Sequence, residues 1–213
     1  GHVHLRGYKS TFEGVGGLVG SGSNTLTLTN CYNTGAVKAT RTNLAYGIGN
    51  RTRYVKNCFT YTPNSHVALA PMQWNRNEET TADNSYYLAN SATELLSPGE
   101  WATLADFASG KVAWGVDGGE GAHTNYWTQI VGRGQNQMPA GPGRAYPKPI
   151  EDPNTEFSVY RALVQYGTGG TATLAANGYG SENQENAVYG FKGTSVTVTA
   201  TPKDDTFGLK SLT

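Results

Sequence analysis

The chain has 213 residues, of which 28 are glycine and only 15% are charged, and its 16 basic and 16 acidic side chains give a formal net charge of zero. A composition rich in glycine and poor in charge favours turns and short strands over helical bundles. No run of residues approaches the roughly 18 consecutive apolar residues that a membrane span requires, so we expect no membrane span.

The first part of the chain contains a short motif that returns at a fixed interval. Residues 29–32 (TNCY) recur as 56–59 (KNCF) and as 83–86 (DNSY), each time after 27 residues. A fixed period of roughly 20 to 50 residues is typical of proteins whose repeats bury their apolar faces on one another. Each period holds short runs of Thr, Val, Leu and Tyr and is too short for a β-α-β unit. We therefore predict one turn of a β-solenoid per period, with successive coils about 4.8 Å apart.

Alignment of the coils at this offset predicts which side chains face inward. It puts an apolar column beside a polar one, namely Leu28, Val55 and Ala82 beside Thr29, Lys56 and Asp83. A bend at the next residue (Asn30, Asn57 or Asn84) would turn the following side chain inward, and asparagine tolerates the left-handed conformation. We expect this asparagine column to be structural rather than a ligand site.

The two cysteines follow this bend in the first two coils. Cys31 and Cys58 occupy equivalent positions, and Ser85 takes that position in the third coil. Stacked strands bring the Cα atoms of such a pair within the range of a disulfide. Side chains that point the same way on adjacent parallel strands nevertheless suit a bridge poorly, so we expect two buried, reduced thiols. Two cysteines do not decide the redox compartment.

Two segments of the first coil carry a resemblance to a known family. Residues 16–20 (GGLVG) and 30–35 (NCYNTG) resemble the GLUG motif, a short repeat of secreted and cell-surface bacterial proteins. The second coil keeps part of the motif at 46–49 (YGIG) and 57–59 (NCF), and the third keeps the asparagine and its neighbours. The resemblance implies a β-solenoid over residues 1–90, of the kind found in IgA-peptidase-type proteases, adhesins and large carbohydrate-active enzymes.

Residues 91–138 have a different pattern, which begins with a predicted helix. Ser97 is a good N-cap, Pro98 suits the first helical position and Glu100 completes a capping box. Apolar residues then recur at helical spacing and stop at a glycine: Trp101, Leu104, Ala105, Ala108 and Gly110. We therefore predict a helix that starts at Ser97 and ends near Gly110.

A second short helix is predicted over residues 111–119, closed by Gly118, and a strand over residues 126–132. This series of segments is similar to the part that commonly follows GLUG repeats, and the resemblance implies that it covers the open end of the solenoid. An uncovered last coil would expose unpaired backbone groups and invite edge-to-edge association. We therefore expect three side chains to lie in the core of this cap rather than on a sugar-binding platform: Trp101, Trp114 and Trp127.

Five of the nine prolines lie between Pro139 and Pro153, so residues 139–156 are predicted to form a linker. Residues 157–213 then predict a small antiparallel domain whose strands lie at 157–165, 171–175, 195–201 and 209–213. Its last two strand segments (SVTVTATPK and LKSLT) resemble the InlB-B-type repeat, a stalk module of secreted Gram-positive proteins. The strands that should follow are missing, so we expect the domain to be incomplete or to be completed from outside the chain.

The expected fold class is therefore mainly β. It combines a short β-solenoid with a small helical cap, followed by an incomplete small antiparallel β domain. Gly1 and His2 look like the remnant of a removed tag, and the chain ends within a strand pattern, so we expect it to be a piece of a longer protein.

The residues that catalysis needs are not gathered in any predicted region. A glycosidase uses two carboxylates roughly 5 to 10 Å apart, and the first 77 residues contain only Glu13. The candidates that follow are spread over caps and turns: Glu94, Glu100, Asp106, Asp117, Glu120 and His123. His2, with His4 beside it, lies two coils or about 9.6 Å from His66, which is too far to share a zinc ion. We expect no enzyme activity, no metal and no cofactor.

Charge is unevenly distributed along the chain. Residues 1–77 carry eight basic side chains against one acidic side chain, a net charge of +7, which leaves −7 for the remainder. This distribution suits attraction to an anionic polymer. It equally suits a solvated solenoid rim on which unlike charges lie on adjacent coils, such as Lys56 beside Asp83. We favour the second interpretation. One binding candidate combines planar cations and aromatic rings on loops of the second coil, although these are also ordinary exposed loop residues: Arg51, Arg53, Tyr54, Trp74 and Arg76.

These patterns lead to two expectations about function. The first is a non-catalytic extracellular module that serves as a stalk, an adhesive surface or an assembly part of a large surface protein of a Gram-positive bacterium. The alternative is an accessory substrate-binding region of a secreted peptidase or carbohydrate-active enzyme whose catalytic domain lies outside this chain. The expected partner is an anionic glycan, a host surface polymer or further copies of the chain, and not nucleic acid.

Overall fold

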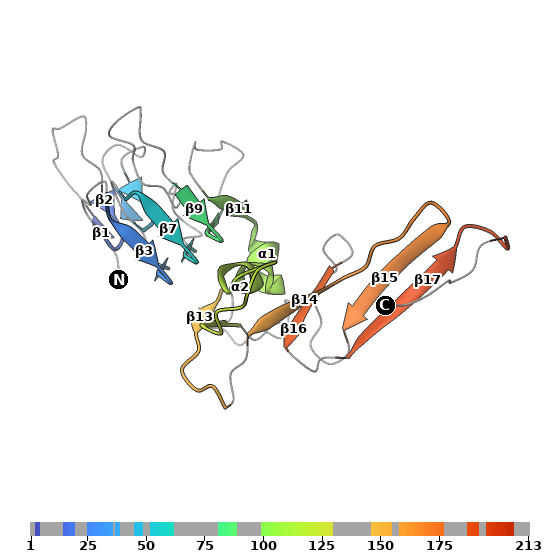
Figure 1. Cartoon of the computed structure of the whole chain (residues 1–213). Coiled ribbons are helices and arrows are strands. Elements are labelled where there is room, and N and C mark those ends of the chain that lie inside the picture. The colour runs from blue at the N-terminus through green and yellow to red at the C-terminus, as the bar shows by residue number, and fades with distance from the viewer. Residues whose placement is uncertain are drawn as a thin grey trace. The chain divides into compact units, whose positions relative to one another are not determined.

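The structure, a computed structural model, describes residues 3–4, 15–19, 25–35, 37–38, 45–48, 52–61, 81–88, 99–129, 146–154, 158–176, 187–191 and 195–206. Within these ranges the chain is mainly β, with several small sheets and two short helices (Figure 1). It divides into two compact units, which are described separately. The N-terminal unit comprises Gly1–Leu104 and Gly115–Thr124, and the C-terminal unit comprises Ala105–Trp114 and Asn125–Thr213.

All the strand pairs of the N-terminal unit are parallel. The two smallest sheets pair β1 (Val3–His4) with β5 (Val37–Lys38) and β2 (Val15–Gly16) with β6 (Ala45–Tyr46). A three-stranded sheet has the order β3 (Thr27–Thr29), β7 (Tyr54–Lys56), β9 (Thr81–Asp83), and these strands lie side by side in Figure 1. A four-stranded sheet has the order β4 (Tyr32–Asn33), β8 (Phe59–Thr60), β10 (Tyr86–Leu88), β11 (Glu100–Ala102).

The register of β3, β7 and β9, and that of β4, β8 and β10, follows the 27-residue interval. Leu28 pairs with Val55, and Val55 pairs with Ala82, so the predicted apolar column is confirmed. Tyr32 pairs with Phe59 at the same offset. Since the side chain of Val55 is almost completely buried whereas those of its two neighbours along the strand are not, the sheet has an apolar inner face and a more polar outer face.

The predicted bends at the asparagines are also confirmed. Asn30, Asn57 and Asn84 each follow a strand of the three-stranded sheet and have positive φ angles of 53°, 54° and 44°. The side-chain amide of Asn84 donates a hydrogen bond of 3.3 Å to Oδ1 of Asn57. A residue with a Cβ atom enters the left-handed region at a cost, which asparagine offsets by local hydrogen bonding. The three residues therefore form a structural corner that is repeated from strand to strand.

We expect Asn57→Ala to lower the free energy of unfolding of the N-terminal unit by about 1 to 2 kcal/mol, because alanine has no side-chain polar group to offset the left-handed conformation. Asn57→Gly is the matched control: it removes the same side-chain amide but adopts a positive φ without steric cost. Urea denaturation followed by circular dichroism measures both. An equal loss of unfolding free energy in the two variants would show that Asn57 does not stabilise the unit by adopting the positive φ.

The core of the N-terminal unit lies between its sheets. One cluster of buried residues consists of Ile48, Val55, Cys58 and Tyr87, with Leu28 and Cys31 packed against it. Phe59 is completely buried, and its ring stacks on that of Tyr32 with 5.3 Å between the ring centroids. These side chains come from strands that are distant in sequence, so the core depends on the parallel pairing of the strands.

The predicted helix at Ser97 is wrong in its first part. Glu100 donates its backbone N–H to the carbonyl of Ser85 at 2.8 Å, and Glu100–Ala102 forms strand β11 at the edge of the four-stranded sheet. Gly99 has a φ of 111°, which a helix cannot contain. Pairing with an open sheet edge therefore prevails over the local capping signal. Helix α1 begins only at Leu104 (Leu104–Ser109) and, as predicted, ends beside Gly110.

The second predicted helix is confirmed. Helix α2 spans Lys111–Val116, and Gly118 follows it with a φ of 126°, which closes the helix in the way that glycine commonly does. None of the helices within the described ranges is long and apolar enough to cross a membrane.

The strand pairs of the C-terminal unit are antiparallel. They are β12 (Trp127–Thr128) with β13 (Lys148–Pro149), β14 (Val159–Leu163) with β16 (Ala187–Phe191), and β15 (Gly170–Ala176) with β17 (Val196–Pro202). Three of the expected strand segments, 157–165, 171–175 and 195–201, overlap β14, β15 and β17, whereas 209–213 lies outside the described residues. Strand β16 was not expected, and the range 139–156, expected to be a linker, contains the paired strand β13.

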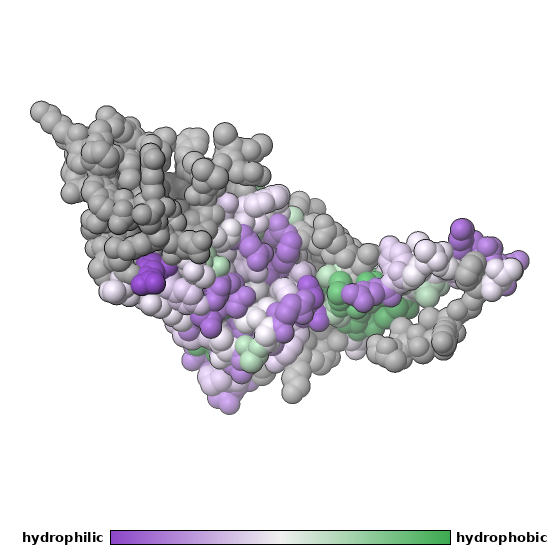
Figure 2. Space-filling model, turned by 45° about the horizontal axis from the view of Figure 1, so that its top comes forward, coloured by the Kyte–Doolittle hydropathy of each residue, from purple (hydrophilic) through white to green (hydrophobic). Residues whose placement is uncertain are grey.

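The tryptophans occupy three different environments. Trp127 is completely buried, as predicted, and Trp114 is half-buried against the cluster of Ala113, Val159, Ala187 and Tyr189. Trp101 was expected in a core but is 55% exposed, because β11 is an edge strand and not the buried face of a helix. Figure 2 shows hydrophobic residues gathered on the part of the surface that belongs to the C-terminal strands.

Candidate functional site

The predicted cation and aromatic site is described only in part. Arg53 is exposed immediately before β7, and Tyr54 is half-buried at the start of that strand. Arg51, Trp74 and Arg76 lie outside the described residues. The hydroxyl of Tyr54 donates a hydrogen bond to the carboxylate of Asp83, and this bond raises the pKa of Tyr54 above its ordinary value. The hydroxyl of Tyr54 thus holds the Asp83 carboxylate on the outer face of the sheet.

The expected ion pair between Lys56 and Asp83 is not formed. The two residues are register partners on β7 and β9, as predicted, but no ion pair joins their side chains, both of which the structure describes. The carboxylate accepts the hydrogen bond from Tyr54 instead. Because Lys56 is exposed, its ammonium group remains on the outer face of the three-stranded sheet. This face thus presents Lys56, and Arg53 is exposed at the residue that precedes the strand.

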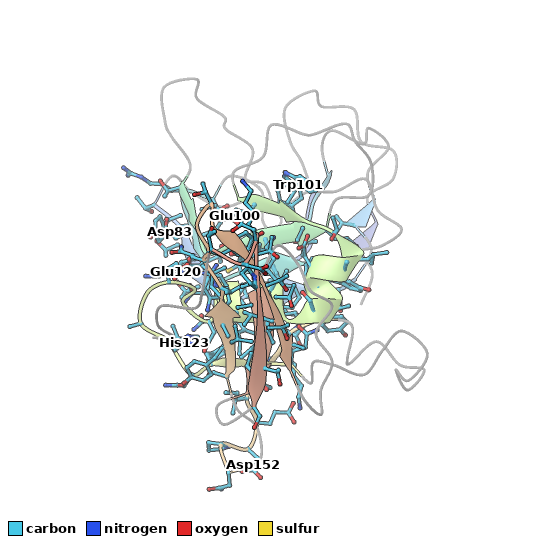
Figure 3. All side chains as sticks on the ribbon, turned by 90° about the vertical axis from the view of Figure 1, so that its right-hand side faces the viewer. Asp83, Glu100, Trp101, Glu120, His123 and Asp152 are labelled. Atoms are coloured by element: carbon cyan, nitrogen blue, oxygen red, sulfur yellow. The ribbon has the colours of Figure 1, made fainter. Side chains whose placement is uncertain are left out.

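A buried carboxylate organises the loop that follows α2. Asp117 is completely buried, and its Oδ1 accepts a hydrogen bond of 2.6 Å from the hydroxyl of Thr124. Its Oδ2 lies 3.1 Å from Nδ1 of His123, and its backbone carbonyl accepts the N–H of Thr124 at 2.7 Å. Gly118 and Gly119 have positive φ angles that let the chain turn back onto the carboxylate. Figure 3 shows His123 and Glu120 on this loop.

The Asp117 and His123 pair has the form of a carboxylate that orients an imidazole, which occurs both in catalytic sites and around metals. Within the described parts of the chain, no group of three His, Cys, Asp or Glu side chains is arranged to hold a metal ion. Both oxygens of Asp117 are occupied by groups of its own loop, so the arrangement supports a structural role. His2, His66 and Glu94 lie outside the described residues, as does the side chain of His4.

The two candidate acids that the structure describes outside this loop, Asp106 and Glu100, have different environments. Asp106 forms an ion pair of 3.1 Å with Lys111. Glu100 is exposed on β11 beside Trp101, as Figure 3 shows. Sequence reasoning treated the acidic residues of this region as scattered, and it missed the contact between Asp117 and His123. A signal for that contact was a turn of two glycines followed by adjacent His and Thr residues.

The cysteine positions form a second polar column inside the N-terminal unit. The N–H of Cys31 donates to Sγ of Cys58 at 3.2 Å, and the N–H of Cys58 donates to Oγ of Ser85 at 3.2 Å. Both thiols are free, as expected. Cys58 is completely buried, but Cys31 is only half-buried, so the expectation of two buried thiols is only partly met. The same contact is therefore repeated at successive strands. The acceptor is the sulfur of Cys58 in the first contact and the oxygen of Ser85 in the second.

The two thiols differ in acidity. The interaction with the neighbouring Cys58 side chain lowers the pKa of Cys31 to about 7, against the opposing effect of its partial burial. The same interaction, together with burial, raises the pKa of Cys58 above its ordinary value. Because a thiolate and not a thiol is the nucleophile, Cys31 is the reactive member of the pair.

Comparison with known proteins finds no matching family model, no similar curated protein and no similar solved structure. Any functional inference therefore depends on the residues of this chain. The features available are the outer face of β3, β7 and β9 with Arg53, the Asp117 loop, and the Cys31 and Cys58 pair.

Proposed function

We propose that the N-terminal unit is a short GLUG-type β-solenoid, and that the chain is a non-catalytic, extracellular structural and adhesive module of a bacterial surface protein. The C-terminal strands are proposed to be part of an InlB-B-type stalk repeat. A regular stack of parallel strands offers a flat face, which suits a role in spacing and adhesion. The surface proposed for adhesion is the outer face of the three-stranded sheet.

The observation that carries this proposal is the register of the parallel strands. Leu28, Val55 and Ala82 are stacked at a constant interval of 27 residues, and a left-handed asparagine follows at the same place each time. A constant interval with a constant corner is what a solenoid requires. The segments that resemble the GLUG motif supply the left-handed asparagines of this corner, which supports the proposal.

The proposed ligand is an anionic glycan that binds along the outer face of this sheet. Lys56 is exposed on this face, Arg53 is exposed at the start of its middle strand, and the first 77 residues carry a large excess of basic side chains. The guanidinium of arginine forms paired hydrogen bonds with carboxylate and sulfate groups, and Tyr54 next to it offers a ring for stacking on a sugar. Such contacts are strengthened at low ionic strength.

We expect Arg53→Glu to weaken binding to a sulfated polysaccharide about three- to tenfold at low salt, because one exposed cation is replaced by an anion. Retention on a heparin column, measured as the salt concentration at elution, tests this. Lys203→Glu is the matched control, since it makes the same change of charge at an exposed position of the C-terminal unit. Equal weakening by both variants, or no retention of the unaltered chain, would contradict binding at this face.

A further inference from the structure

Cys31 and Cys58 lie on neighbouring parallel strands at equivalent positions. The N–H of Asn30 donates to the carbonyl of Lys56 at 3.0 Å, and the N–H of Phe59 donates to the carbonyl of Cys31 at 3.1 Å. These two hydrogen bonds enclose the pair and hold the strands at the usual separation of about 4.8 Å. A disulfide requires Cα atoms roughly 4.4 to 6.8 Å apart, so the backbone already meets this condition.

The sulfur of Cys58 points toward the strand that carries Cys31. It lies 3.2 Å from the backbone nitrogen of Cys31 and 3.6 Å from the carbonyl oxygen of Leu28. The sulfur of Cys58 is thus in contact with the backbone of the residue with which it would form a bridge. The same left-handed corner precedes both cysteines, and each thiol donates to the carbonyl two residues before it, Thr29 for Cys31 and Lys56 for Cys58. The two side chains therefore point the same way, and a bridge requires the half-buried Cys31 side chain to turn toward Cys58.

We propose that Cys31 and Cys58 form a thiol–disulfide exchange site, at which Cys31 attacks a small-molecule disulfide and Cys58 then closes a bridge between the two strands. In the first step the Cys31 thiolate forms a mixed disulfide and releases one thiolate of the reagent. In the second step the Cys58 thiol attacks Sγ of Cys31 and displaces the second thiolate, and the proton that Cys58 gives up is taken by the departing thiolate. Two protein thiols are thereby oxidised, and one disulfide is reduced to two thiols.

The burial of the two residues assigns these separate roles. Cys31 is half-buried and therefore reachable by a small reagent, whereas Cys58 is completely buried and reachable only by Cys31. The lowered pKa of Cys31 favours its thiolate near neutral pH. Once Cys31 is in a mixed disulfide, its hydrogen bond with Cys58 no longer raises the pKa of Cys58, and burial remains as the main opposing effect. Attack by Cys58 thus becomes easier after the first step.

The chain itself supplies a conservative substitution for the test. Ser85 occupies the position of the cysteines in the third strand and accepts the N–H of Cys58 as Cys58 accepts that of Cys31. Serine is therefore already tolerated at one position of the Cys31, Cys58 and Ser85 column. For this reason we expect both Cys31→Ser and Cys58→Ser to fold. Circular dichroism spectra that match the unaltered chain check this before the thiols are examined.

The test is incubation of the folded full chain with oxidised glutathione, followed by mass spectrometry of the intact protein and of peptides digested without reduction. We expect the unaltered chain to lose two hydrogen atoms and to give a peptide cross-linked between Cys31 and Cys58. Cys58→Ser should stop at a single glutathione adduct on Cys31, and Cys31→Ser should remain unmodified. A stable glutathione adduct on the unaltered chain, no reaction at all, or an adduct on Cys31→Ser formed as fast as on Cys58→Ser would overturn the proposal.

Discussion

Phe59→Ala is expected to lower the free energy of unfolding of the N-terminal unit by about 3 to 5 kcal/mol. The ring of Phe59 is completely buried, stacks on Tyr32 at 5.3 Å and is the register partner of Tyr86 on the other side. Its removal would leave a cavity in the middle of an aromatic column that spans three strands. Neighbouring backbone is held by inter-strand hydrogen bonds and cannot collapse into this cavity, so the loss should lie near the upper end of the range for buried aromatics.

Urea denaturation followed by circular dichroism measures this loss. Trp101→Ala is the control, because it removes a larger aromatic side chain from the same unit at a position that is 55% exposed. We expect it to cost less than about 1 kcal/mol, as most substitutions on the surface do. Similar losses for both variants would mean that Phe59 is not the packed centre of the column.

Gly17→Ala is expected to cost about 3 kcal/mol, through overpacking between two neighbouring parallel strands. A Cβ atom at Gly17 would lie 2.3 Å from the carbonyl oxygen of Gly47 and 2.5 Å from Nδ2 of Asn33. The first of these is a backbone atom. The second belongs to a side chain that is held by a hydrogen bond of 2.9 Å to the carbonyl of Gly35. Neither can move aside without a shift of the backbone.

The control for this variant is Gly167→Ala in the C-terminal unit, where no atom lies within 4 Å of the added Cβ. We expect its free energy of unfolding to stay within about 1 kcal/mol of the unaltered value, because the substitution only restricts the unfolded chain. Hydrogen exchange of the amides of β3, β7 and β9 reports on the N-terminal unit separately. Unchanged protection of these amides in Gly17→Ala would show that the close approach at this glycine is not required.

The part of the fold that could be predicted is the part where one interval governs many residues. The spacing of Cys31 and Cys58 gave the alignment of the strands. The same alignment located the left-handed asparagines, because the side chain after each strand can turn inward only if the backbone bends at one residue. Both inferences combine a repeated pattern with a backbone rule. They did not require any knowledge of contacts between distant segments.

The elements that could not be predicted depend on such contacts. Strand β11 has a good local helix signal but pairs with β10, and a local signal does not report an open sheet edge. Strand β16 begins with three consecutive buried residues, Ala187, Val188 and Tyr189, so it lacks the alternation by which strands are recognised. The approach of His123 to Asp117 depends on two glycines with positive φ. The sequence shows that glycine is present, but it does not show which φ each glycine adopts or where the loop then runs.

The claim on which the whole account depends is that residues 27 apart lie beside one another on parallel strands. Scalar couplings measured by NMR through the inter-strand hydrogen bonds test it most directly, because they join a named amide nitrogen to a named carbonyl carbon. The expected couplings run from the amides of Asn57 and Tyr86 to the carbonyls of Asp83 and Cys58, respectively. Couplings that join these amides to other carbonyls would contradict the stacking, and with it the proposed solenoid.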